Sequence, residues 1–228
     1  MSCCTPQNPT RIAGLEQLAR RAAGVVIGDL ADAGETRDLT DQANALGGID
    51  AVIQNAGIYT DAQRVATPEG HARTLAVNTL APYLLTAWIE GPCRFIYLSS
   101  DMHHRGQTAL RDIDWVDRRW HGVQAYCDSK LYTTTFAFAL ARRDRTRCVH
   151  VVDPGWVPTR MGGSGATDDL KLGHRTQTWL AVSDDPDLTM PGYWYHRQRN
   201  TPAAAALDAT FQDELLGELA GLTDVQLL

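Results

Sequence analysis

Cysteines are few in this 228-residue sequence, and basic residues are outnumbered by acidic ones. The cysteines are odd in number and show no Cys-x-x-Cys spacing, which gives no support for a disulfide framework or a zinc site. Lys and Arg number 21 against 27 Asp and Glu, for a net charge of −6. A nucleic-acid partner normally requires a basic surface, so the charge balance argues against one and favours a small-molecule ligand.

Long hydrophobic runs are also missing. No stretch approaches the roughly 18 uninterrupted apolar residues of a membrane span, and residues 1–9 contain no apolar segment typical of a signal peptide. We therefore expect neither export nor a membrane span, and a cytoplasmic location with reduced thiols. The composition, 44% hydrophobic and 21% charged, is that of a globular protein that buries a sizeable core.

Short apolar runs alternate with segments of helical periodicity along the chain. Thr67, followed by Pro68, is a typical helix start. The alternation predicts a doubly wound parallel α/β sheet of the Rossmann type, in a single domain over residues 1–228. Helices are expected at 10–22, 34–46, 67–88, 123–143, 169–181 and from 202 onward, and strands at 25–27, 50–53, 94–98, 149–152 and 193–195.

Small or polar residues follow four of these strands. They are Asp29, the run Asn55-Ala56-Gly57, Ser100, and Pro154-Gly155. Ligands of doubly wound sheets bind outside the carboxyl ends of the strands. We therefore expect these residues to line one cleft.

Tyr126 and Lys130 stand four residues apart near the start of the helix expected at 123–143. That spacing places both side chains on one helix face. A nearby ammonium favours the phenolate and lowers the pKa of a tyrosine, which would let Tyr126 act as an acid near neutral pH.

Four blocks in order resemble the short-chain dehydrogenase/reductase family over nearly the whole chain: Asn55-Ala56-Gly57, Asn78, Ser100, and Tyr126 with Lys130. A Pro-Gly-x-x-x-Thr segment from Pro154 to Thr159 follows. The long gap between Ser100 and Tyr126, the pair His103-His104 and the pattern Tyr-Cys-x-Ser-Lys are similar to the retinol-dehydrogenase-like branch, which handles lipophilic alcohols and carbonyls.

The resemblance implies an NAD(P)-dependent enzyme that interconverts a carbonyl and an alcohol on a small substrate. Tyr126 would be the proton donor, and Ser100 would stabilise charge on the same substrate oxygen. Lys130 would support Tyr126 and hold the nicotinamide ribose, and Asn78 would order a water that leads to the lysine.

The resemblance also implies which residues meet the coenzyme. Asp29 and Leu30 would lie at the adenine, and the small residues Asn55, Ala56 and Gly57 would let the backbone approach the adenosine half. Pro154, Gly155, Trp156 and Thr159 would meet the nicotinamide end, beside Tyr126 and Lys130.

The retinol-dehydrogenase-like branch implies an apolar substrate, which we expect to enter beneath residues 157–191. Gly162, Gly163 and Gly165 would allow this segment to move as a lid. The resemblance leaves a homo-oligomer open.

Two other chemistries have weaker support. His103 and His104 are adjacent, and neighbouring residues rarely point the same way, so no metal site is expected. The run Gly162-Gly163-Ser164-Gly165-Ala166 has Ala where a hydrolase motif needs its last Gly, and no strand precedes it.

The family's glycine-rich turn is not found before the strand at 25–27. Gly24 and Gly28 flank that strand and cannot form the turn. We therefore expect an N-terminally truncated domain without the family's first βαβ unit, so that 25–27 slides in beside 50–53 and coenzyme binds poorly. The alternative is a noncatalytic Rossmann-like remnant that acts as a binding or regulatory module.

Overall fold

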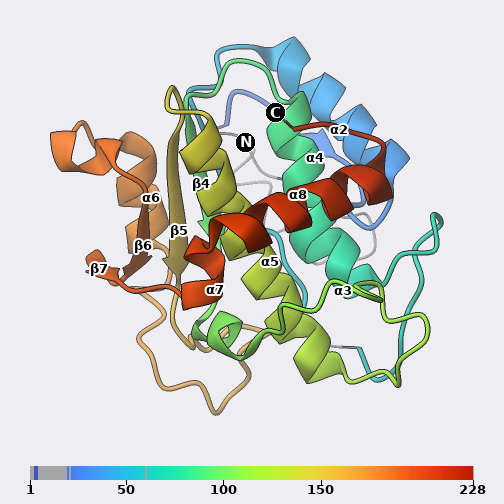
Figure 1. Cartoon of the computed structure of the whole chain (residues 1–228). Coiled ribbons are helices and arrows are strands. Elements are labelled where there is room, and N and C mark those ends of the chain that lie inside the picture. The colour runs from blue at the N-terminus through green and yellow to red at the C-terminus, as the bar shows by residue number, and fades with distance from the viewer. Residues whose placement is uncertain (1–2, 5–19, 21, 60, 228) are drawn as a thin grey trace.

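A five-stranded sheet forms the centre of the computed structural model, which describes residues 3–4, 20, 22–59 and 61–227 (Figure 1). Its strands lie in the order β3-β4-β5-β6-β7, parallel except for β7. Their bounds are β3 Ala51–Gln54, β4 Arg94–Leu98, β5 Cys148–Asp153, β6 Gly192–Tyr195 and β7 Gln198–Asn200. The predicted parallel α/β fold is confirmed.

The two faces of the sheet carry separate clusters of buried side chains. Phe95 and Tyr97 of β4 pack with helix α5, whereas Ile96 and Leu98 pack on the opposite face. This alternation is the period of two that a strand imposes, and burial on both faces is typical of parallel sheets. Figure 1 shows α5 and α8 on one side of the sheet and α6 on the other.

The helices correspond broadly to the predicted ones. They are α2 Ala33–Leu46, α3 Arg73–Leu75, α4 Ala81–Trp88, α5 Gly122–Arg143, α6 Arg175–Val182, α7 Ala204–Leu207 and α8 Ala209–Thr223. A π-helical turn, Ala76–Leu80, joins α3 to α4, and 3-10 segments cover Asp101–Arg105 and Pro186–Thr189. The helix predicted at 10–22 lies almost wholly outside the described residues.

The predicted start of the third helix at Thr67 is wrong, because α3 begins at Arg73. Thr67 is instead the first residue of a tight turn that ends at Gly70. The Gly70 amide donates to the Thr67 carbonyl over 2.9 Å, and Gly70 has φ +93°. The helix predicted at 169–181 begins later, at Arg175. The antiparallel strand β7 was not predicted.

Strand β2, Val26–Ile27, belongs to a separate two-stranded sheet. It pairs in parallel with β1, Cys3–Cys4, so the expectation that both neighbouring strands are absent is wrong for one of them. The expected shift of β2 beside β3 is also wrong. The side-chain amide of Gln42 accepts from the Ile27 N–H over 3.3 Å and donates to the Ile27 carbonyl over 3.1 Å. These two bonds satisfy the backbone N–H and C=O of Ile27, which are therefore not available to pair with another strand.

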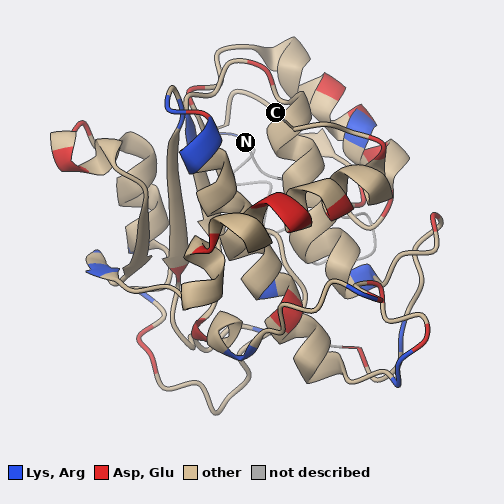
Figure 2. Ribbon diagram, in the orientation of Figure 1, with Lys and Arg blue, Asp and Glu red and all other residues tan. Residues whose placement is uncertain are grey.

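Acidic and basic residues are spread over loops and several helices rather than gathered on one element (Figure 2). Within the described part of the chain, no helix combines the length and the apolar character that crossing a bilayer requires.

Candidate active site

The carboxyl ends of β3, β4 and β5 meet at one edge of the sheet. Gln54 is in register with Tyr97, and Leu98 is in register with Val152. The residues that follow these strands therefore converge there, as expected for a doubly wound sheet.

Helix α5 brings Tyr126 and Lys130 to this edge. Tyr126 is 6% exposed and Lys130 is 5% exposed. The Lys130 Nζ lies 5.7 Å from the centre of the Tyr126 ring and donates to the Leu98 carbonyl over 2.8 Å. The lysine is therefore fixed to the end of β4, on the same helix face as the tyrosine.

Ser100 lies directly after β4 and caps the 3-10 segment Asp101–Arg105. Its Oγ accepts from the Met102 amide over 3.3 Å. Its side chain also acts on Tyr126 and lowers the pKa of that hydroxyl. The two hydroxyl groups thus lie together, as a site that binds one substrate oxygen requires.

Asn78 lies in the π-helical turn, an irregularity that often occurs at functional sites. Its side-chain amide donates to the Ile58 carbonyl over 2.9 Å and to the Ser129 Oγ over 3.0 Å, and its Oδ1 accepts from the Ile58 amide over 2.9 Å. Asn78 therefore fastens the loop after β3 to helix α5.

Gly57 lies close to the side chains of both Asn78 and Lys130. A Cβ on Gly57 would lie 3.4 Å from the Asn78 Oδ1 and 3.6 Å from the Lys130 Nζ. The Asn55-Ala56-Gly57 loop therefore passes close to the lysine.

Burial governs the protonation of the two central groups. Desolvation raises the pKa of Tyr126 to about 12, although the Ser100 side chain acts in the opposite direction. Desolvation likewise lowers the pKa of Lys130 to about 8, opposed by the charge of Asp153. The expectation that Lys130 depresses the pKa of Tyr126 is not met, because removal from water raises this pKa and the negative charge of Asp153 raises it further.

Asp29 and Leu30 lie at the end of β2, in the smaller sheet. The Asp29 carboxylate accepts from the Ala31 amide over 3.0 Å, and its own amide donates to Glu35 over 2.7 Å. Leu30 is 7% exposed and packs in a cluster with Val26 and Leu39. The hydrogen bonds recorded for Asp29 are local and join it to none of the residues around Tyr126.

The segment after β5 is fastened by Asp168, which sequence reasoning missed. Its Oδ2 accepts from the Trp156 amide over 2.7 Å and from the Tyr195 hydroxyl over 3.3 Å. Gly155 has φ +83°, and a Cβ there would lie 2.4 Å from the same Oδ2. Pro154 is half-buried, and Trp156 and Thr159 are exposed.

Two further residues next to Tyr126 were also missed. The ring of Tyr59 meets that of Tyr126 edge-on, with 4.8 Å between centres. Asp153, the last residue of β5, is buried, accepts from the Gly155 amide over 3.0 Å and acts electrostatically on Tyr126 and Lys130. Burial raises the pKa of Asp153. Asp153 directly follows the strand predicted at 149–152, and this position could have identified it, whereas Tyr59 lies in the loop beyond Gly57 and has no such signal.

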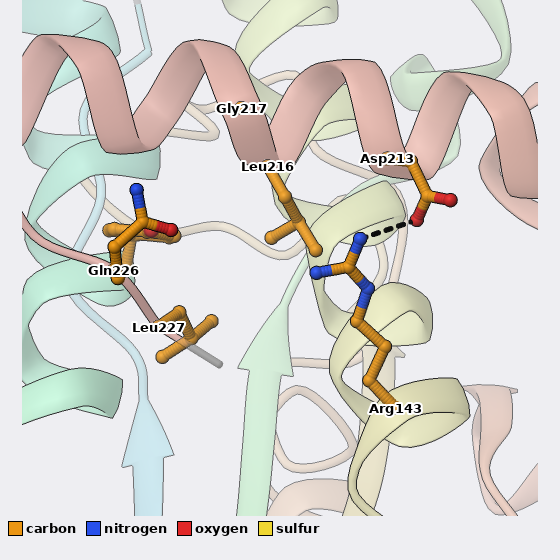
Figure 3. A pocket seen from close by; sticks show the side chains of 7 residues that line it. Arg143, Asp213, Leu216, Gly217, Gln226 and Leu227 are labelled. Carbon is orange, nitrogen blue, oxygen red and sulfur yellow. Dashed lines mark hydrogen bonds and ion pairs between the residues drawn. The ribbon is translucent and has the colours of Figure 1, made fainter.

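The hollow in Figure 3 lies elsewhere, between α8 and the C-terminal tail. Its volume is about 210 Å³, and the Arg143 Nη2 meets the Asp213 Oδ1 over 2.8 Å at one end. The lining residues include none of the predicted site residues and are Tyr83, Arg143, Asp213, Leu216, Gly217, Gln226 and Leu227.

Comparison with known proteins identifies the family. The short-chain dehydrogenase chry4 of Gibberella zeae is 37% identical over 210 residues, which cover 90% of this chain and 81% of chry4. The chain belongs to the short-chain dehydrogenase/reductase family. This family consists of NAD(P)-dependent oxidoreductases, so a noncatalytic remnant is not favoured. No family model matches the chain.

More distant relatives support the retinol-dehydrogenase-like branch and the fold. Human retinol dehydrogenase 13 is 27% identical over 204 residues, 78% of this chain and 61% of that protein. A crystal structure of a Mycobacterium paratuberculosis protein matches with a TM-score of 0.81 and 24% identity, over 99% of this chain and 85% of that one. The NADPH-bound carbonyl reductase from chicken fatty liver matches with a TM-score of 0.58 and 19% identity, over 87% and 85%.

Proposed function

We propose that this chain reduces a carbonyl to an alcohol, or catalyses the reverse reaction, with Tyr126 as the proton donor. The observation that carries the proposal is the convergence of Tyr126, Ser100 and Lys130 at the end of β4. The Ser100 side chain acts on the Tyr126 hydroxyl, and the Lys130 Nζ lies 5.7 Å from the centre of the Tyr126 ring. A helix, a strand end and a loop each contribute to this cluster.

The coenzyme proposed is NAD(P), which supplies or accepts the hydride when bound. The residues at the nicotinamide end fit such a group, since Gly57 has no side chain to crowd the Lys130 Nζ, which a Cβ there would contact at 3.6 Å. Lys130 would hold the ribose, and Asn55, Ala56, Pro154, Gly155, Trp156 and Thr159 would contact other parts of the coenzyme. The NADPH in the chicken carbonyl reductase supports this assignment.

Each side chain has a defined task in carbonyl reduction. Tyr126 is protonated at neutral pH and transfers its proton to the substrate oxygen as negative charge develops there. The Ser100 hydroxyl donates a hydrogen bond to the same oxygen and stabilises that charge. Lys130 is charged below pH about 8 and stabilises the phenolate left on Tyr126. Asn78 holds the loop after β3 in place, and we retain for it the ordering of a water near Lys130.

The proposed substrate is small and apolar. The likeness to retinol dehydrogenase 13 supports this class, as do the exposed apolar side chains Trp156, Met161 and Leu170 on the segment after β5. Asp29 and Leu30 remain proposed for the adenine end. A single domain over residues 1–228, a cytoplasmic location and a homo-oligomer complete the proposal.

The test is a substrate series with NADPH and with NADH. With coenzyme at millimolar concentration, purified chain should oxidise reduced nicotinamide in the presence of aldehydes and ketones, and kcat/KM should rise with the length of the apolar substituent. A clear preference for short charged carbonyls contradicts the apolar substrate, and no turnover with any member contradicts the enzyme assignment.

A further inference from the structure

The imidazole of His103 connects two distant parts of the chain at the back of the site. It is fully buried in the 3-10 segment after Ser100. Its Nδ1 lies 2.8 Å from the Ser100 carbonyl oxygen, and its Nε2 lies 2.9 Å from the Ala203 amide nitrogen. Ala203 is the residue before helix α7, one hundred positions further along the chain.

These two contacts determine where the imidazole proton is. A backbone N–H can only donate, so Nε2 must accept from Ala203 and carries no proton. The proton of the neutral ring is then on Nδ1, which donates to the carbonyl of Ser100. Burial agrees with this state, because it lowers the pKa of His103 to about 4.

The ring itself has little freedom to move. It lies against the Tyr193 ring of β6 with 4.8 Å between centres, and against His104 with 4.1 Å. The His103 backbone amide donates to the same Ser100 carbonyl over 3.0 Å. The Ser100 carbonyl thus accepts two hydrogen bonds, one from the main chain and one from the side chain of the same residue.

We propose that His103 is a positioning residue, whose Nδ1–H fixes the Ser100 backbone so that the Ser100 hydroxyl stays beside the Tyr126 hydroxyl. The inference rests on the proposed function of Ser100 and Tyr126. His103 touches neither substrate nor coenzyme, and it acts through Ser100. The bond from Ala203 holds the ring in place, so the C-terminal segment before α7 supports the serine.

Two amide variants separate the two bonds. In His103→Asn the side-chain amide takes the place of Nδ1 and keeps the donor to Ser100. In His103→Gln the side-chain oxygen takes the place of Nε2 and keeps the acceptor for Ala203. Each variant leaves one buried bond unmade, so their stabilities should be similar. An exposed residue in the turn between α5 and β5 provides the control, Arg145→Gln.

We expect kcat of His103→Gln to fall about 10- to 100-fold with little change in KM, because a small displacement of a catalytic group has costs of that order. His103→Asn should retain kcat within about threefold of the unmodified chain. Arg145→Gln should match the unmodified chain. Equal losses of kcat in His103→Asn and His103→Gln would overturn the inference, because a merely structural histidine affects both alike.

NMR provides a readout that needs no turnover. Nitrogen-15 shifts of the His103 ring should show the proton on Nδ1, and a proton on Nε2 would overturn the inference. Hydrogen exchange should become faster at the residue 103 amide in His103→Gln and at the Ala203 amide in His103→Asn. If the unmodified chain turns over no carbonyl, the proposed function fails. The NMR results would still show whether His103 holds the Ser100 carbonyl through Nδ1–H.

Discussion

Lys130 is an ammonium group held against the end of β4, out of contact with water. Because burial lowers its pKa to about 8, the charge that supports Tyr126 is present at neutral pH and is lost above that value. We therefore predict that kcat for carbonyl reduction falls as the pH rises through about 8. The measurement is a pH series of kcat from about pH 6 to about pH 10. A level profile contradicts the role, and any residual activity of Lys130→Arg should lack this fall, because a guanidinium stays charged.

Asp168 fastens the segment that is proposed to cover the substrate. Asp168→Ala removes the acceptor for the Trp156 amide and for the Tyr195 hydroxyl. We predict that KM for an apolar ketone rises about fivefold to tenfold, the equivalent of roughly one lost hydrogen bond, whereas kcat changes little.

The control for this prediction is the neighbouring acid. Asp169→Ala removes only a local bond to the Lys171 amide and should leave both constants near their original values. If Asp168→Ala and Asp169→Ala have the same KM, the segment after β5 does not contribute to substrate binding.

At this scale the sequence predicted which residues gather and missed how they are supported. Ser100, Tyr126 and Lys130 meet as expected, because spacing on one helix and position after parallel strands are local properties. Asn78, which the family resemblance implied, bonds to Ser129 next to Lys130. The support from Asp168 and His103 depends on partners far along the chain, and no local pattern encodes such contacts. The direction of the Tyr126 pKa was missed because burial is a property of the folded molecule.

Among the elements, the strongest periodic segments were predicted best. The strand β4 has the predicted bounds, and α5 differs by one residue at its start. The start of α3 was missed because Gly70, with its positive φ, ends a turn where Thr67 and Pro68 suggested a helix. Strands β1 and β7 were missed because two or three residues give too short a pattern.

Two buried histidines connect elements and make the fold sensitive to acid. His150 of β5 accepts from the Trp194 Nε1 over 3.1 Å and lies 3.0 Å from the Leu188 carbonyl, and burial lowers the pKa of His103 and of His150 to about 4. An unfolded histidine takes up its proton near pH 6.5, so between about pH 6.5 and 4 the unfolded chain binds more protons. The free energy of unfolding should therefore fall as the pH falls through this window.

We predict that each of these histidines contributes a slope of about 1.4 kcal/mol per pH unit within the window. Urea unfolding at several pH values between about 6 and 4.5 measures the slope. In His150→Leu the slope should fall by one such contribution, although the variant is less stable at neutral pH because Trp194 and Leu188 lose a partner. An unchanged slope in His150→Leu contradicts the neutral, buried state of this ring.

For the whole molecule, the residues proposed for catalysis lie together at one edge of the sheet, whereas the sequence before β2 contains no glycine-rich turn for the coenzyme's phosphates. Before Gly24 the sequence contains a single glycine, Gly14, and β2 with Asp29 belongs to a separate small sheet. A glycine-rich turn at a helix N-terminus is the usual anion contact in this fold. We predict that the 228-residue chain binds NADPH and NADH with Kd well above the micromolar range. Titration followed by nicotinamide fluorescence measures this, and a micromolar Kd for either coenzyme contradicts it.

The central claim is that a proton from Tyr126 completes carbonyl reduction, and Tyr126→Phe tests it most directly. The variant keeps the buried ring and deletes the hydroxyl. With coenzyme at millimolar concentration, kcat should fall by about 100-fold or more, as for loss of a general acid. Tyr132→Phe is the matched control, since Tyr132 is buried on the same helix outside the site, and its kcat should be essentially unchanged. Turnover in Tyr126→Phe equal to that of the unmodified chain contradicts the account.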